Sequence, residues 1–199
     1  MHIIESLKDI GVVSNVELVL RERGKIIARR DGHNVFTVTG RNLLSKLLAW
    51  QTISTTDIPF THRRTRWIGV GKGSQLEVTT VSSLVNPVLA NSTDYLVAVQ
   101  SAEFPTSTSV RFIKEFGVNE ITTTPTPVVV TEAGLFADVN PANMGGTEDV
   151  GHAGPCPPNP PSTVLDPTSP SNAAICYKAF EGLTKTINFT LDIRWEFRF

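Results

Sequence analysis

The sequence is short of charge and of long apolar runs, and each shortage argues against a class of protein. Charged residues make up 19% of the 199 residues, and the formal net charge is −1. This balance gives no electrostatic reason to expect a nucleic acid or an anionic membrane as a partner. No apolar run approaches the roughly 20 residues that cross a bilayer, and the N-terminus lacks the basic start and apolar core of a signal peptide. We therefore expect the protein to stay in the compartment where it is made.

The two cysteines and four histidines do not form a metal-binding pattern. Cys156 and Cys176 are two isolated thiols and cannot supply the four ligands of a structural zinc site. A reducing cytoplasm favours free thiols over a disulfide between them, but the sequence leaves their pairing open. No histidine has a second histidine, a cysteine or a paired carboxylate at a ligand spacing: His2, His33, His62 and His152. We predict no bound metal and no cofactor.

The chain also lacks the motifs of common catalytic sites. The glycine cluster at 69–74 (GVGKGS) has the spacing of neither a P-loop nor a dinucleotide-binding motif, so we interpret it as a turn that ends a strand. No serine lies in a Gly-x-Ser-x-Gly elbow. Scattered carboxylates leave a glycosidase pair open without suggesting one: Glu103, Glu115, Glu120 and Glu132. The sequence predicts no catalytic residue and a protein that is not an enzyme.

What the sequence does contain is a β pattern, most clearly at 187–199. Apolar residues occupy every odd position there and polar residues every even position, which predicts a long strand with one buried and one solvated face. The odd positions are Ile187, Phe189, Leu191, Ile193, Trp195, Phe197 and Phe199.

The remaining elements also favour a mainly β fold. Strands are expected at 16–22 and 25–30, joined by a turn at Arg23-Gly24 and followed by a second turn at Asp31-Gly32. Further extended segments are expected at 33–38, 66–70, 94–100, 109–117 and 126–131. One amphipathic helix is predicted from Thr39 to Trp50, capped by Thr39 or Gly40, and a short helical turn is predicted at 77–85.

These elements predict a β-sandwich or jelly-roll-like fold in a single domain, 1–199, with one helix. Seven of the 13 prolines lie between 155 and 170. Because proline supports neither a helix interior nor a central strand, we interpret 140–172 as a surface insertion loop. Whether it is a docking arm or a solvated loop stays open.

The basic run 62–67 (HRRTRW) allows two interpretations. It could contact a phosphate backbone, with Trp67 stacking on a base. Alternatively, it is an exposed loop whose charges contact acidic residues on another subunit. The near-neutral balance of the whole chain favours the second interpretation.

A set of ordered motifs resembles small structural proteins of tailed bacteriophages. The set covers most of the chain apart from the N-terminal hairpin and the proline-rich insertion, and each motif alone has low specificity. In order, the motifs are 32–41 (GHNVFTVTGR), 64–71 (RTRWIGVG), 130–136 (VTEAGLF, interpreted as a turn), 177–180 (YKAF), 184–186 (TKT) and 191–199 (LDIRWEFRF).

This resemblance implies a virion component, assembled in the cytoplasm of the host bacterium, that works by self-association and by docking on other subunits. The leading hypothesis is a capsid decoration (cement) protein, a trimer bound to the major capsid protein. A neck, tail or baseplate subunit is the alternative. From another class comes a glycan-binding β-sandwich for host recognition, which the core-like periodicity of two tryptophans disfavours.

Overall fold

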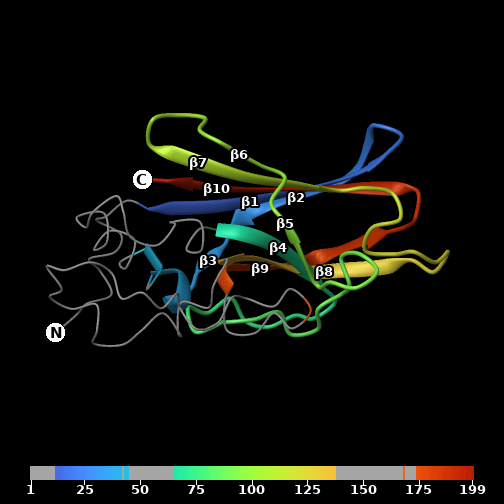
Figure 1. Ribbon diagram of the computed structural model, residues 1–199, viewed down its shortest axis with the longest axis horizontal. Coiled ribbons are helices and arrows are strands. Elements are labelled where there is room, and N and C mark those ends of the chain that lie inside the picture. The colour runs from blue at the N-terminus through green and yellow to red at the C-terminus, as the bar shows by residue number, and fades with distance from the viewer. Residues whose placement is uncertain (1–11, 42, 45–64, 138–167, 169–173) are drawn as a thin grey trace, which may run out of the picture.

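The computed structural model describes residues 12–41, 43–44, 65–137, 168 and 174–199. They form two five-stranded antiparallel sheets packed face to face as a β-sandwich, which confirms the predicted fold class (Figure 1). Sheet I has the strand order β2-β1-β10-β7-β6, and sheet II has the order β3-β9-β8-β4-β5. The bounds are β1 Val13–Glu22, β2 Lys25–His33, β3 Val35–Phe36, β4 Thr65–Gly71, β5 Leu96–Ala98, β6 Ser101–Glu103, β7 Ser109–Phe116, β8 Val128–Ala137, β9 Ala174–Lys185 and β10 Phe189–Arg198.

Strand β10 occupies the centre of sheet I, between β1 and β7. Its inward-facing residues are buried, as the alternation predicted: Leu191, Ile193, Trp195 and Phe197. The strand is shorter than expected, since 187–188 belong to the turn that enters it and Phe199 is 56% exposed. The apolar face of β10 is buried because it packs against sheet II, which covers that face of sheet I.

The N-terminal hairpin has the predicted turn but a longer second arm. Arg23 (φ 48°) and Gly24 (φ 82°) have the two positive φ angles of a type I′ turn, which matches the twist of the flanking strands. The predicted turn at Asp31-Gly32 is wrong. Both residues lie within β2, where Asp31 pairs with Glu17 and Gly32 with Val16 on β1. The hydrogen-bonded pairing of β2 with β1 outweighs the preference of the Asp-Gly pair for a turn.

Two expectations in the middle of the chain are also wrong, and one strand is shorter than expected. The strand predicted at 94–100 is β5, which spans Leu96–Ala98 and pairs in sheet II. The chain then crosses to sheet I, where β6 pairs. The turn predicted within 130–136 lies inside β8, which extends well beyond the predicted 126–131. Segment 77–85 has a turn at 79–80 but no helix.

Strand β9, the longest described strand, was not predicted at all. It and β8 lack a simple alternation because both faces of sheet II are largely covered, and β8 is buried at nearly every position from Val130 onward. The inner face contributes to the core between the sheets. The outer face packs against segment 72–88, forming a second small core that includes Val81, Leu84, Phe136 and Tyr177.

The helix begins earlier than predicted and has a different cap. Residues 38–41 and 43–44 are helical, and the continuation toward Trp50 lies outside the described residues. Thr37, not Thr39 or Gly40, is the N-cap, because its Oγ1 accepts the Gly40 N–H at 3.0 Å. The same hydroxyl donates to the Ala174 carbonyl at 2.6 Å, so the cap also fixes the helix to β9.

The insertion at 140–172 falls outside the described residues apart from Thr168, and so do His62, Arg63 and Arg64 of the basic run. Within the described part of the chain, no helix is long and apolar enough to cross a membrane.

Candidate functional site

The most polar buried site in the described structure surrounds Glu132, in the middle of β8. The residue has no exposed surface. Oε1 accepts the backbone N–H groups of Gly73 at 3.0 Å and Asn86 at 2.9 Å. Oε2 accepts the Val85 N–H and the Tyr177 hydroxyl, both at 3.1 Å. A buried carboxylate requires such donors, and here they attach segment 72–88 to the outer face of sheet II.

The glycine cluster makes room for this carboxylate. A Cβ atom added at Gly73 would lie 2.6 Å from Glu132 Oε1, and one at Gly71 would be closer still. Strand β4 ends at Gly71, which confirms that the cluster ends a strand. The Gly73 N–H points at the protein's own glutamate rather than at a phosphate, so the glycines serve close packing.

The network also changes the ionisation of Tyr177. Burial raises the pKa of its hydroxyl, and the negative charge of Glu132 raises it further. The phenol therefore remains protonated and donates to Glu132. The Tyr177–Glu132 hydrogen bond is a structural contact, because the two residues lie on the neighbouring strands β9 and β8.

A second buried ionisable group, Lys185, lies at the end of β9. Its Nζ donates to the carbonyls of Gly117 at 3.1 Å and Thr186 at 3.0 Å. Burial lowers the pKa of the amine to about 8, although the negative charge of Glu120 acts in the opposite direction. Lys185 therefore joins the loop after β7 to the turn between β9 and β10.

Cys176 lies on β9 in the core between the sheets, with a free thiol. Its Sγ is 3.8 Å from the Ser14 hydroxyl oxygen on β1. Burial raises the thiol pKa to about 12, although the hydrogen bond with Ser14 favours the thiolate. Since the thiolate is the nucleophile, this thiol is unreactive at neutral pH. Cys156 lies outside the described residues.

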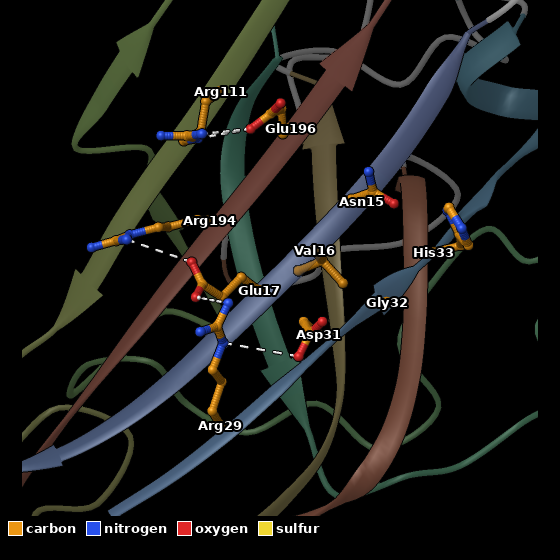
Figure 2. Close-up of a pocket in the computed structure, with 10 residues that line it drawn as sticks. All are labelled: Asn15, Val16, Glu17, Arg29, Asp31, Gly32, His33, Arg111, Arg194 and Glu196. Atoms are coloured by element: carbon orange, nitrogen blue, oxygen red, sulfur yellow. Dashed lines mark hydrogen bonds and ion pairs between the residues drawn. The ribbon is translucent and has the colours of Figure 1, made fainter. Parts of the chain in front are cut away.

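The outer face of sheet I is polar, and its charges form rows across the strands. Opposed residues on neighbouring strands share one face. One row runs His33–Asn15–Glu196–Arg111–Glu103, and the next runs Asp31–Glu17–Arg194–Ile113–Ser101. Figure 2 shows charged side chains of these rows, with Arg111 directed at Glu196 and Arg194 directed at Glu17.

Ion pairs connect these charges along and between the rows. Glu17 accepts from Arg29 at 2.9 Å and from Arg194 at 3.5 Å. Arg111 donates to Glu196 at 2.6 Å, and hydrogen bonds from Arg111 and Arg198 hold the pKa of Glu196 below its usual range. Between the rows lies an open hollow of about 360 Å³. Its lining carries three arginines and three carboxylates, so the hollow attracts neither anions nor cations strongly.

A smaller hollow of about 160 Å³ lies at one end of the sandwich and is apolar. Phe197 contacts Phe36 and Phe112 edge to face there, with ring centroids 5.9 and 6.0 Å apart. These aromatic residues pack against the buried residues of the main core. The hollow is therefore an open end of the hydrophobic core.

The carboxylates considered for a glycosidase lie on separate elements. Glu132 is buried on the outer face of sheet II, whereas Glu103 and Glu115 lie on β6 and β7 of sheet I. Glu120 accepts from the Gly117 N–H and from Lys114 Nζ at 3.2 Å. Among the described residues, no three histidine, cysteine or acidic side chains are arranged to hold a metal ion.

Sequence reasoning missed the roles of Glu132, Tyr177 and Lys185. A signal for Glu132 was available, because it is the single charge in the otherwise uncharged run of β8 and a buried charge must find partners. Lys185 had no comparable signal, since its partners are backbone carbonyls contributed by distant turns.

The chain matches no protein-family model, no curated protein and no solved structure. The resemblance to tailed-phage virion proteins therefore stays a prediction.

Proposed function

We propose that the protein is a non-enzymatic structural subunit of a tailed-phage virion, and that it acts as a capsid decoration protein. The observation that supports a structural role is the use of the buried ionisable groups. Glu132, Lys185 and Asp192 are buried, and each is bonded to groups of its own fold. Polar groups that a catalytic site would direct toward a substrate are used here to fix loops on a rigid sandwich.

A rigid subunit with fixed loops suits a decoration protein. Such a protein stabilises a shell by mass action, because it buries surface across neighbouring capsid subunits in the assembled state alone. Little ordering entropy is lost on docking when the docking elements are already held in place. A symmetric homo-oligomer, with a trimer as the working hypothesis, would present several such surfaces at once.

The alternative position is the neck, tail or baseplate, where the same fold and the same docking would serve. Glycan recognition has less support from the tryptophans considered for an aromatic platform. Trp195 is completely buried in the core, and Trp67 is only partly exposed on β4.

Copy number tests the proposal. Purified particles of the phage that encodes the chain are separated by gel electrophoresis, and this protein is quantified against the major capsid protein. We expect a ratio close to that of the capsid protein. A few copies per particle would place the protein in the neck, tail or baseplate instead. If the protein is missing from the particles, the virion proposal is wrong.

A further inference from the structure

The hairpin between β1 and β2 projects from sheet I and carries exposed apolar residues. In Figure 1 it is the blue loop at the upper right, which bends away from β10. Residues 22–27, here called the hairpin tip, are exposed at every position. Ile26 is 51% exposed and Ile27 is 47% exposed, next to each other at a bulge in the pairing with β1. Two adjacent half-exposed isoleucines on a rigid hairpin are suited to burial against a partner.

The turn of the hairpin contains a residue that is unfavourable for folding. Arg23 adopts a φ of 48°, in the left-handed region, at a type I′ position where asparagine or aspartate followed by glycine is preferred. A long side chain with a Cβ atom is strained in this conformation. Strain of this kind is typical of sites where a side chain serves a purpose other than stability.

The hairpin is also strongly basic. From 21 to 30 the chain has five basic residues and one acidic residue. Arg21 pairs with Asp192 at 3.0 Å, Arg29 with Glu17 at 2.9 Å, and Arg30 with Glu181 at 2.9 Å. The remaining two, Arg23 and Lys25, lie in the hairpin tip and have no ion-pair partner among the described residues. Two positive charges therefore precede the isoleucines in the hairpin tip, which also contains one negative charge, Glu22.

The other described sheet edges are protected against contact with a further chain. Strands β5 and β6 have three residues each, β6 is followed closely by Pro105, and β3 has two residues. The exposed edge of β9 is occupied by side chains, because Glu77 accepts the Ala179 N–H and Arg30 donates to the Glu181 carbonyl. The hairpin tip has no comparable protection within the described structure.

We propose that the hairpin tip docks on another virion subunit, at an acidic surface with an apolar hollow that receives Ile26 and Ile27. This inference rests on the proposed function, since the partner is a virion protein. A second copy of the same tip is a poor partner. A twofold contact between tips would bring Arg23 and Lys25 close to their own copies, and like charges repel across an interface.

The test uses particles of the encoding phage grown without this gene, to which the purified full-length protein is added over a concentration series. Bound protein is measured by co-sedimentation. The variant Lys25→Thr/Ile26→Thr removes one cation and one isoleucine from the tip and keeps residues that favour strands. The matched control is Lys72→Thr/Leu76→Thr, which removes one exposed cation and one exposed apolar residue elsewhere, Leu76 being 82% exposed.

We expect the tip variant to bind at least tenfold more weakly than the wild type, and the control to bind within about twofold of it. Arg23→Asn separates docking from folding, because it should weaken binding severalfold while it raises the melting temperature. Raising the salt concentration should weaken wild-type binding and narrow the difference between wild type and Arg23→Asn.

The outcomes distinguish the two proposals. Wild-type protein that does not bind the particles would contradict the virion proposal itself. Wild-type binding that the tip variant matches would contradict the docking role of the hairpin and leave the virion proposal intact. Sedimentation velocity without particles gives the third outcome. A wild-type oligomer that the tip variant splits into monomers would make a second copy the occupant and overturn the acidic partner.

Discussion

The outer faces of the two sheets differ in how their charged side chains are paired. On sheet I the outer face is polar and open, and its charges pair sideways across neighbouring strands. On sheet II the outer face is covered by segment 72–88, and the charge beneath it, Glu132, bonds to backbone N–H groups of that segment. A face open to water accepts charges at little cost, whereas a covered face requires a complete set of hydrogen bonds.

This difference determines what each sheet contributes to stability. Exposed ion pairs are each worth little, since water screens them and both side chains lose freedom. Removing a buried carboxylate that has four donors lowers the free energy of unfolding much more, because its partners lose their acceptor. Substitutions on the covered and open faces test this contrast.

The largest effect is expected between the sheets, at Trp195. Trp195→Asp places an unpaired charge in the main core and should prevent soluble expression. Ile113→Asp is the control. It makes the same kind of change on the neighbouring strand β7, but on the outer face, where Ile113 lies opposite Arg194. We expect that variant to lose less than about 1 kcal/mol. A well-folded Trp195→Asp protein would show that β10 is assigned to the wrong face.

The next effect is expected at Glu132. Glu132→Ala leaves three backbone N–H groups and the Tyr177 hydroxyl without their acceptor, so the free energy of unfolding should fall by about 3 kcal/mol. Glu17→Ala on the open face should lose less than about 1 kcal/mol. Urea denaturation measures both values, and proteolysis should cut segment 72–88 faster in the Glu132 variant alone. Equal losses in the two variants would remove the distinction between the faces.

A pH-dependent effect is expected from Lys185. Its pKa is lowered to about 8 in the folded protein, against about 10.4 in an unfolded chain. Between these values the unfolded chain binds more protons, so stability contributed by this residue rises with pH. From pH 8 to pH 9.5 the wild type should gain about 1.5 kcal/mol relative to Lys185→Met.

The comparison with Lys185→Met is essential, because the Cys176 thiol changes stability in the opposite direction over part of this range. Its pKa is raised by burial, so its contribution falls with pH above about 9 in both proteins and cancels in the difference. Parallel stability curves for the two proteins would mean that Lys185 remains charged in the fold.

The smallest effect is expected at the hairpin turn. Arg23→Asn replaces a strained residue with one that type I′ turns favour, so the free energy of unfolding should rise by about 0.5–1 kcal/mol. Thermal denaturation measures the gain, and Glu22→Gln serves as a control at a neighbouring exposed position. A lower melting temperature for Arg23→Asn would show that the arginine side chain stabilises the isolated protein.

The long strands of the two sheets also differ in how far they could be predicted from the sequence. Strand β10 and the β1–β2 hairpin were predicted because one face of sheet I is exposed to solvent. A strand with one exposed face has alternating polar and apolar residues, and this pattern is visible in the sequence. The first part of β9 and the second half of β8 were missed because both of their faces are covered. Strands that are covered on both faces have no alternation of polar and apolar residues by which they could be predicted.

The motifs used for the resemblance show the same limit. Glu132 in 130–136, Gly71 in 64–71 and Lys185 in 184–186 lie in buried contacts of the fold. Their order along the chain was visible in the sequence. The contacts that use them join β8, segment 72–88 and the loop after β7, which are far apart in the chain.

The β class, the buried face of β10, the hairpin turn and the lack of familiar catalytic motifs could all be read from the sequence, because each depends on neighbours within a few residues. Folding was needed to show that 72–88 covers sheet II and that Glu132 and Lys185 are bonded to distant backbone groups. Folding also showed that Arg23 and Lys25 lie at a projecting tip with no ion-pair partner among the described residues. Those properties depend on which distant segments meet in space, and hydrogen-bonding requirements of buried groups decide them only once the chain has folded.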